Sequence, residues 1–194
     1  MDYMKATSEM KVQISHVFVD GFYQWLRYLS KDKERLCRAM THMFNADCFF
    51  VAIQNGEVIG ITACVAKGEK CVRLNRREFA KHLGFVRGSI AYAMLHKEFE
   101  VKTYPIPIGK DAGAVEFVAV LSVHRGKGVA AGLIQHIFSV TDFREYILEV
   151  ADTNTEAVRL YTRLGFTEIL RVQQKHTKQS GINALVYMKR ESAQ

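Results

Sequence analysis

Residues Arg125–Ala130 combine two glycines and two cations at a point where a buried strand is expected to change into a helix. Glycine lets backbone N–H groups approach an anion without a Cβ in the way, and the N-terminus of a helix adds partial positive charge. Arg125 and Lys127 place full positive charges beside that backbone. The segment therefore predicts a binding site for a pyrophosphate.

The glycines alone leave other interpretations open. Gly126, Gly128 and Gly132 differ by one residue from the spacing of a dinucleotide-binding fingerprint, but that fingerprint normally opens its domain. Its acidic residue should also end the next strand, whereas Glu149 lies inside the predicted one. A Walker A loop is excluded because no Ser or Thr follows Lys127. A tight strand-to-helix turn without a ligand is the remaining alternative.

Two carboxylates lie within apolar runs on the strands beside this turn. Glu116 alternates with Val118 and Val120, so all three side chains are expected on one face of their strand. Glu149 lies between Leu148 and Val150 on the next strand. A carboxylate among apolar residues has a raised pKa, which suits a general base near neutral pH. Either residue can instead be a structural acid whose hydrogen bonds are satisfied.

Hydrophobic periodicity predicts the elements that position these residues. We expect a first helix capped by Thr7 or Ser8, a β-hairpin turning at Asn55-Gly56, and two short helices or one broken helix within residues 67–111. Two β-α units in sequence, beginning at residue 114, imply parallel neighbouring strands. The other expected elements are helices over 31–44, 126–140 and 154–164 and strands over 48–54, 57–66, 114–121, 145–151, 166–172 and 182–189.

The composition favours one globular domain over residues 1–194. Of these residues, 48% are hydrophobic, and no Gly/Ser-rich linker divides the chain. The net charge of +7 suits an anionic partner, but the basic residues are scattered rather than clustered as in a nucleic-acid-binding surface. Residues 67–111 form an insertion that we expect on the substrate side, with additional cover of the core as the alternative.

The cysteines Cys37, Cys48, Cys64 and Cys71 form no CxxC pair and have no histidines at zinc-finger spacing, so we predict small buried or half-buried thiols and no metal site. The polar start of the chain does not resemble a signal peptide, and no apolar stretch approaches the roughly 20 residues of a membrane span. These features predict a cytoplasmic protein without a membrane partner.

Two motifs, in this order, closely resemble the GNAT superfamily of N-acetyltransferases. The first contains Val118, Val120, Arg125, Gly128 and Ala130; the second contains Leu148-Glu149-Val150, Asn154, Ala157, Leu160-Tyr161 and Gly165-Phe166. The resemblance implies an α/β (α+β) fold with a mixed central sheet of about six to seven strands flanked by helices. It also implies that strands 114–121 and 145–151 splay apart. Family members often form dimers, so a homodimer is a further expectation.

The resemblance implies acetyl-CoA as acyl donor and an amine as acceptor. Tyr161 matches the family tyrosine that protonates the departing thiolate, although a buried tyrosine packed on Leu160 and Leu164 is the alternative. Asn154 would contact the coenzyme arm, although Thr153 and Glu156 can form a capping box at that helix start. The backbone of Val118, Ala119 and Val120 would pair with pantetheine, and the amides of Arg125, Gly126, Lys127, Gly128, Val129 and Ala130 would hold the pyrophosphate.

The resulting hypothesis is an N-acetyltransferase that moves an acetyl group to a primary amine of a small molecule or protein. No Cys or Ser lies in a nucleophile motif near the glycine turn, which favours direct attack in a ternary complex. Glu116, Glu149 or bulk water would accept the proton of the amine. The alternatives are a non-catalytic CoA-binding regulatory module and a basic nucleic-acid-binding protein.

Overall fold

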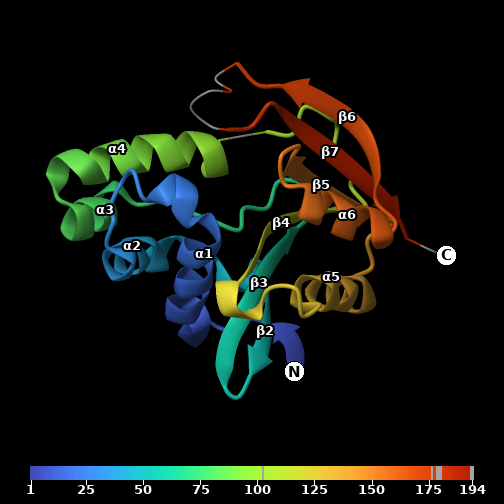
Figure 1. The fold of residues 1–194 in the computed structure, drawn as a ribbon, viewed down its shortest axis with the longest axis horizontal. Helices are drawn as coiled ribbons and strands as arrows, with labels where there is room; N and C mark the ends of the chain where they lie inside the picture. Colours follow the sequence, from blue (N-terminus) through green and yellow to red (C-terminus); the bar gives the residue numbers. More distant parts are fainter. Residues whose placement is uncertain (102, 176, 178–180, 193–194) are drawn as a thin grey trace.

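A computed structural model describes residues 1–101, 103–175, 177 and 181–192. Its strands form one seven-stranded sheet in the order β1-β2-β3-β4-β5-β7-β6 (Figure 1). Only β4 and β5 run parallel among these neighbours, which confirms the predicted mixed sheet. The strands are β1 Asp2–Lys5, β2 Phe49–Gln54, β3 Glu57–Val65, β4 Ala112–Val120, β5 Glu145–Ala151, β6 Thr167–Gln173 and β7 Ala184–Glu191.

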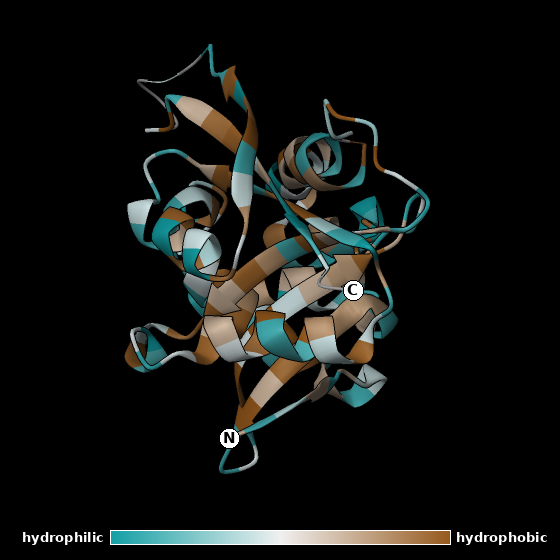
Figure 2. Cartoon of the chain, turned by 90° about the vertical axis from the view of Figure 1, so that its right-hand side faces the viewer, coloured by the Kyte–Doolittle hydropathy of each residue, from teal (hydrophilic) through white to brown (hydrophobic). Residues whose placement is uncertain are grey.

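Helices cover both faces of the sheet and enclose two apolar cores (Figure 1). The first core lies under α1 Lys11–Leu26, α2 Lys33–Met40, α3 Arg76–Leu83 and α4 Phe85–Leu95. The second lies under α5 Val129–Val140 and α6 Thr155–Arg163. In Figure 2 the central strands are mostly brown, that is, apolar. The four cysteines are buried free thiols, as expected.

The start of the chain differs from the expectation. Ser8–Met10 form a 3₁₀ turn, and α1 begins only at Lys11 without a side-chain cap, so the predicted cap at Thr7 or Ser8 is wrong. The physical reason is the short edge strand β1, which pairs with β2 and continues into a bond from the Ala6 amide to the Phe49 carbonyl. The chain must then turn away from the sheet before it can become helical.

The predicted hairpin turn is confirmed by its backbone angles, and two further residues set the ends of α3 Arg76–Leu83. Asn55 and Gly56 have φ values of 53° and 81°, as a two-residue hairpin turn of type I′ requires. Asn75 caps α3 by accepting a hydrogen bond from the Arg77 amide at 2.9 Å. Gly84, with φ of 84°, separates α3 from α4, and a π-helix, His96–Glu100, follows α4, so the insertion contains more than one helix.

Close packing of α3 and α4 makes Gly88 a sensitive position. A Cβ at Gly88 would lie 2.5 Å from the backbone nitrogen of Ala80. Alanine normally stabilises a helix relative to glycine, but this clash with backbone should reverse the sign. We expect Gly88→Ala to lower the free energy of unfolding in urea by about 2 kcal/mol. Gly132→Ala is the control, because its new Cβ would meet the movable side chain of Tyr3; an equal or larger loss there would contradict the argument.

Candidate active site

The parallel strands β4 and β5 pair over only part of their length. Their ladder begins at Ala112 and Glu145 and ends at Val115 and Leu148, although β4 continues to Val120 beside β3. The predicted splay is therefore present. The backbone of residues 118–120 is not paired with β5, and the Val120 carbonyl accepts a hydrogen bond from Nε of Arg125 at 3.2 Å.

A β-bulge in β4 changes which side chains share a face. Phe117 has φ of 52°, and the register with β3 shifts between Ile61 and Ala63. Val118 and Val120 consequently pack in the core under α5, whereas Glu116 contacts residues on the face of α1–α4. The prediction that Glu116 shares their face is wrong, because an extra residue in a strand breaks the two-residue alternation.

The glycine turn presents unbonded amides. Gly126 and Gly128 have φ values of 74° and 79°, and a Cβ at either would meet no atom within 4 Å. Within the described part of the chain, the amides of residues 126–128 donate to no acceptor. Because α5 begins at Val129 rather than at the predicted residue 126, the N–H groups of its first turn are also left without helical partners. This backbone fits an anion of pyrophosphate type.

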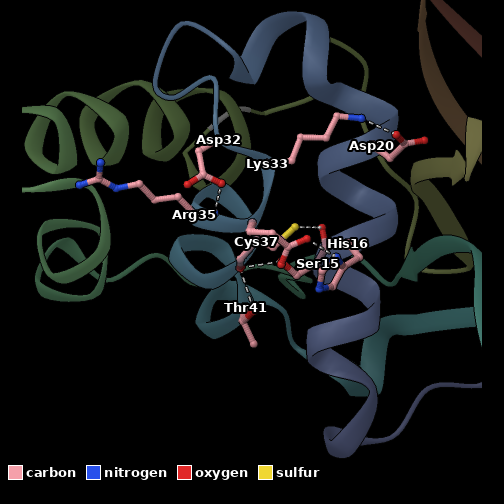
Figure 3. A network of polar contacts seen from close by, with 9 residues as sticks. Ser15, His16, Asp20, Asp32, Lys33, Arg35, Cys37 and Thr41 are labelled. Carbon is pink, nitrogen blue, oxygen red and sulfur yellow. Dashed lines mark hydrogen bonds and ion pairs between the residues drawn. The ribbon is translucent and has the colours of Figure 1, made fainter.

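The loop before the glycine turn is anchored to α1 and α2. The carboxylate of Asp20 accepts hydrogen bonds from the Ser122 amide at 2.8 Å and from Nζ of Lys33 at 2.7 Å. Figure 3 shows Lys33 reaching from α2 to Asp20 on α1. Burial would raise the pKa of Asp20, but the hydrogen bonds from Lys33 and Ser122 hold it below its ordinary value. A cavity of about 190 Å³ beside this anchor is lined in part by His16, Glu34 and Val123.

Asn154 begins α6, which follows β5. Its Oδ1 accepts a hydrogen bond from the Ala157 amide at 3.3 Å, so Asn154 itself is the helix cap. The predicted capping box of Thr153 and Glu156 is wrong, because the chain becomes helical one residue later. The capping role of Asn154 satisfies a backbone donor without any ligand.

Tyr161 lies in the second core, with its ring centroid 6.0 Å from that of Phe166. Its side chain is only 6% exposed, and its hydroxyl forms no hydrogen bond to the described residues. A buried tyrosine hydroxyl normally has a partner, so this one is available to a bound molecule. Burial raises the pKa of Tyr161, which keeps the phenol protonated and able to donate a proton.

The two predicted carboxylates flank the point where the strands part. Glu116 and Glu149 directly follow Val115 and Leu148, the last positions at which β4 and β5 pair with each other. The hydroxyl of Tyr104 donates to Oε1 of Glu116 at 3.2 Å, and burial together with the charges of Glu116 and Glu149 raises the pKa of Tyr104. Glu149 lies opposite Tyr187 on β7. Burial and the neighbouring Glu149 raise the pKa of Tyr187.

Sequence reasoning missed three residues around these carboxylates: Cys71, Tyr104 and Tyr187. Cys71 donates from Sγ to Oε2 of Glu116 at 3.0 Å, across 45 positions of the sequence. No motif marks these residues, because they reach the site through loops and through the sheet register. Among the described residues, no group of three or more His, Cys, Asp or Glu is arranged to hold a metal ion. No described helix has the length and apolar character needed to cross a membrane.

Solved structures of acetyltransferases share this fold over nearly the whole chain. The ribosomal-protein-S18-alanine N-acetyltransferase from Escherichia coli superposes with a TM-score of 0.60 at 13% identity, covering 100% of this chain and 94% of that one. The ribosomal-protein-alanine N-acetyltransferase from Brucella melitensis has a TM-score of 0.59 at 15% identity, with coverage of 98% and 99%. An N-acetyltransferase from Staphylococcus aureus Mu50 has a TM-score of 0.59 at 13% identity, with coverage of 97% and 100%.

At these identities the likeness shows the fold alone. No curated protein sequence matches the chain. The model of the acetyltransferase (GNAT) family, however, matches residues 12–166, which include β4, the glycine turn, β5 and α6. The chain therefore belongs to the GNAT family of acetyltransferases.

Proposed function

We propose that the protein is an N-acetyltransferase that transfers an acetyl group from acetyl-CoA to a primary amine of a small molecule or protein. The observation that carries this proposal is the end of the β4–β5 ladder at Val115 and Leu148, beside the unbonded amides of residues 126–128. An extended pantetheine arm can pair with strand backbone that lacks a neighbour, much as an added strand does. The turn would hold the pyrophosphate at the same time.

We propose that the coenzyme contacts three parts of the chain. Backbone groups of Val118, Ala119 and Val120 would face the pantetheine arm, and the amides of residues 126–130 would hold the pyrophosphate, with Arg125 and Lys127 adding charge. The Arg125 amide, which was also expected to bind there, donates instead to the Ser122 carbonyl at 3.4 Å. Asn154, at the start of α6, would contact the arm while it caps the helix. The anchor from Asp20 to the Ser122 amide would keep the turn in place before the ligand arrives.

The reaction requires a proton acceptor on one side and a proton donor on the other. Acetyl-CoA supplies a thioester, whose carbonyl carbon bonds to the amine nitrogen as its bond to sulfur breaks. Glu116 or Glu149, on the face of α1–α4, would take the proton that the amine loses, directly or through water. Tyr161, in the core under α5 and α6, would donate its proton to the departing sulfur. Donor and acceptors thus approach from opposite faces.

The cysteines support direct attack rather than an acyl-enzyme intermediate. Burial is the main cause that raises the pKa of Cys37 to about 11 and that of Cys64 to about 12. Burial also raises the pKa values of Cys48 and Cys71. Thiols in this state contain little thiolate near neutral pH, and the thiolate is the nucleophile. We therefore propose transfer in a ternary complex of protein, acetyl-CoA and amine.

Binding and turnover can be tested separately. Acetyl-CoA at 100 times its Kd should stabilise the folded protein by about 2.7 kcal/mol, seen as a rise in Tm. A panel of polyamines, amino acids, aminoglycosides and peptides with free N-termini should then include acceptors that release CoA. Propionyl-CoA and succinyl-CoA test the acyl preference.

Two outcomes would contradict the proposal. Thermal stabilisation by acetyl-CoA without CoA release from any amine would indicate a non-catalytic CoA-binding module. Absence of stabilisation, combined with binding to random DNA whose affinity falls steeply as the salt concentration rises, would indicate a nucleic-acid-binding protein.

The insertion over residues 67–111 is the segment that we propose for acceptor selection. It contributes α3 and α4 and the loop that carries Tyr104 to Glu116. An amine that gives up its proton to Glu116 would therefore meet this segment. The matched relatives that act on ribosomal-protein alanine make peptide N-termini a class worth including in the panel.

A further inference from the structure

Both carboxylate oxygens of Glu116 have a hydrogen-bond donor from outside β4. The hydroxyl of Tyr104 donates to Oε1 at 3.2 Å, and the thiol of Cys71 donates to Oε2 at 3.0 Å. These donors come from two different loops, before α3 and after α4. A carboxylate oxygen can accept more than one hydrogen bond, so a donor on each oxygen does not by itself prevent contact with an amine or a water.

We propose that Tyr104 and Cys71 are positioning residues that hold the Glu116 carboxylate in orientation for proton transfer. This inference rests on the proposed function, because it assigns a task to two residues around the same site. It goes beyond that function in making the insertion part of the catalytic arrangement rather than only a substrate surface.

The chemistry of the groups fixes the direction of both hydrogen bonds, because an ionised carboxylate can only accept. Burial is the main cause that raises the pKa of Tyr104 and of Cys71, and the charge of Glu116 raises both further. Phenol and thiol therefore stay protonated at neutral pH and act as donors throughout. Donors to the charged form of a carboxylate favour that form. The pair would thus favour the ionised form of Glu116 as well as orient it.

Tyr104 also connects the two carboxylates of the site. Its ring centroid lies 6.0 Å from that of Tyr187, which faces Glu149 across the β5–β7 register. The described titratable groups that interact with Glu116 or with its two donors include Cys48, Cys64, Cys71, Tyr104 and Glu149. Removing one hydroxyl from this set should change the titration of Glu116 without changing the packing.

The test compares pH profiles of kcat/KM for CoA release by the full-length protein. Tyr104→Phe keeps the ring and removes one donor, so the pKa of Glu116 should rise. The acidic limb of the profile, where kcat/KM falls as Glu116 becomes protonated, should therefore move to higher pH by about one unit. At pH values below the pKa of Glu116, this shift corresponds to about a tenfold loss of kcat/KM. Cys71→Ala should move the limb in the same direction by less, because a thiol is a weak donor. Cys71→Ser, which again supplies a donor, should return the acidic limb to its wild-type position.

Tyr23→Phe is the matched control. Tyr23 is also packed against the first core, but its hydroxyl donates to the Lys31 carbonyl at 2.8 Å rather than to a carboxylate. This variant should leave the pH profile unchanged. In parallel, NMR of protein labelled with ¹³C at glutamate carboxyls follows the titration of Glu116 without turnover, with Glu116→Gln identifying the signal.

The outcomes separate this inference from the proposed function. Matching shifts of the Glu116 titration and of the acidic limb in Tyr104→Phe support the positioning role. An unchanged titration overturns it, and so does a shifted titration with an unchanged limb, because the carboxylate would then take no part in turnover. If Tyr104→Phe fails to fold, the Cys71 variants decide by the same two readouts. Failure of the proposed function would appear instead as absence of CoA release from the wild-type protein.

Discussion

Replacing Tyr161 with phenylalanine is expected to lower kcat about 100-fold while leaving the Kd for acetyl-CoA within about twofold of the wild-type value. The variant keeps the aromatic ring that packs against Phe166 and loses only the hydroxyl. That hydroxyl has no partner among the described residues, so its loss leaves no broken hydrogen bond within them. A loss of turnover with retained binding would therefore report proton donation to the leaving sulfur.

Tyr146→Phe is the control for this prediction. Tyr146 is buried in the same core, and burial raises its pKa as well, but its hydroxyl shares a hydrogen bond with Thr141 at 2.7 Å. Its removal should reduce stability and leave kcat unchanged. Single-turnover measurements should show that the chemical step is affected in Tyr161→Phe. Unchanged turnover in Tyr161→Phe, where that step limits the rate, would remove Tyr161 from the mechanism.

The pH dependence of turnover gives a second check on Tyr161. Because burial raises its pKa, the donor form persists above the range of an ordinary tyrosine. Tyr161 should therefore produce no basic limb between pH 6 and about 10. A basic limb in that range that disappears in Tyr161→Phe would contradict the raised pKa.

The sequence predicts those parts of the fold that depend on local chemistry. The Asn55-Gly56 turn needs positive φ, and its residue types reveal that need. The strand-helix alternation from residue 114 likewise predicts the parallel pair β4–β5, which is present. Each of these features is decided by a few neighbouring residues.

The features that sequence reasoning missed depend on distant parts of the chain. The bulge at Phe117 is a feature of the β3–β4 register, and the Thr62 hydroxyl bonds to the Glu116 carbonyl there at 3.2 Å. Strand β1 is short and polar, and it is a strand only because β2 offers it an edge. The contacts of Cys71 and Tyr104 with Glu116 likewise form only when the loops fold over β4.

Replacing Glu116 with glutamine is expected to lower kcat/KM at neutral pH about 100-fold, because glutamine keeps the shape of the side chain and cannot accept the proton. Glu149→Gln is the matched comparison. Both residues directly follow Val115 and Leu148, the last positions at which β4 and β5 pair with each other, so both would lie beside a thioester bound at that point. Glu116 is the stronger candidate because Tyr104 and Cys71 fix both of its oxygens, and a general base must be held in a productive geometry.

The two glutamine variants, taken together, distinguish three proton acceptors. If Glu116 is the base, Glu116→Gln loses the acidic limb of its pH profile and Glu149→Gln keeps it. The opposite pattern would assign the base to Glu149 and leave Glu116 a structural acid held by its two donors. Retention of turnover in both variants would point to bulk water, which suffices only when the acceptor amine is already largely deprotonated. In that case, kcat/KM should follow the titration of the amine itself, and changing to an amine of lower pKa should shift the profile with it.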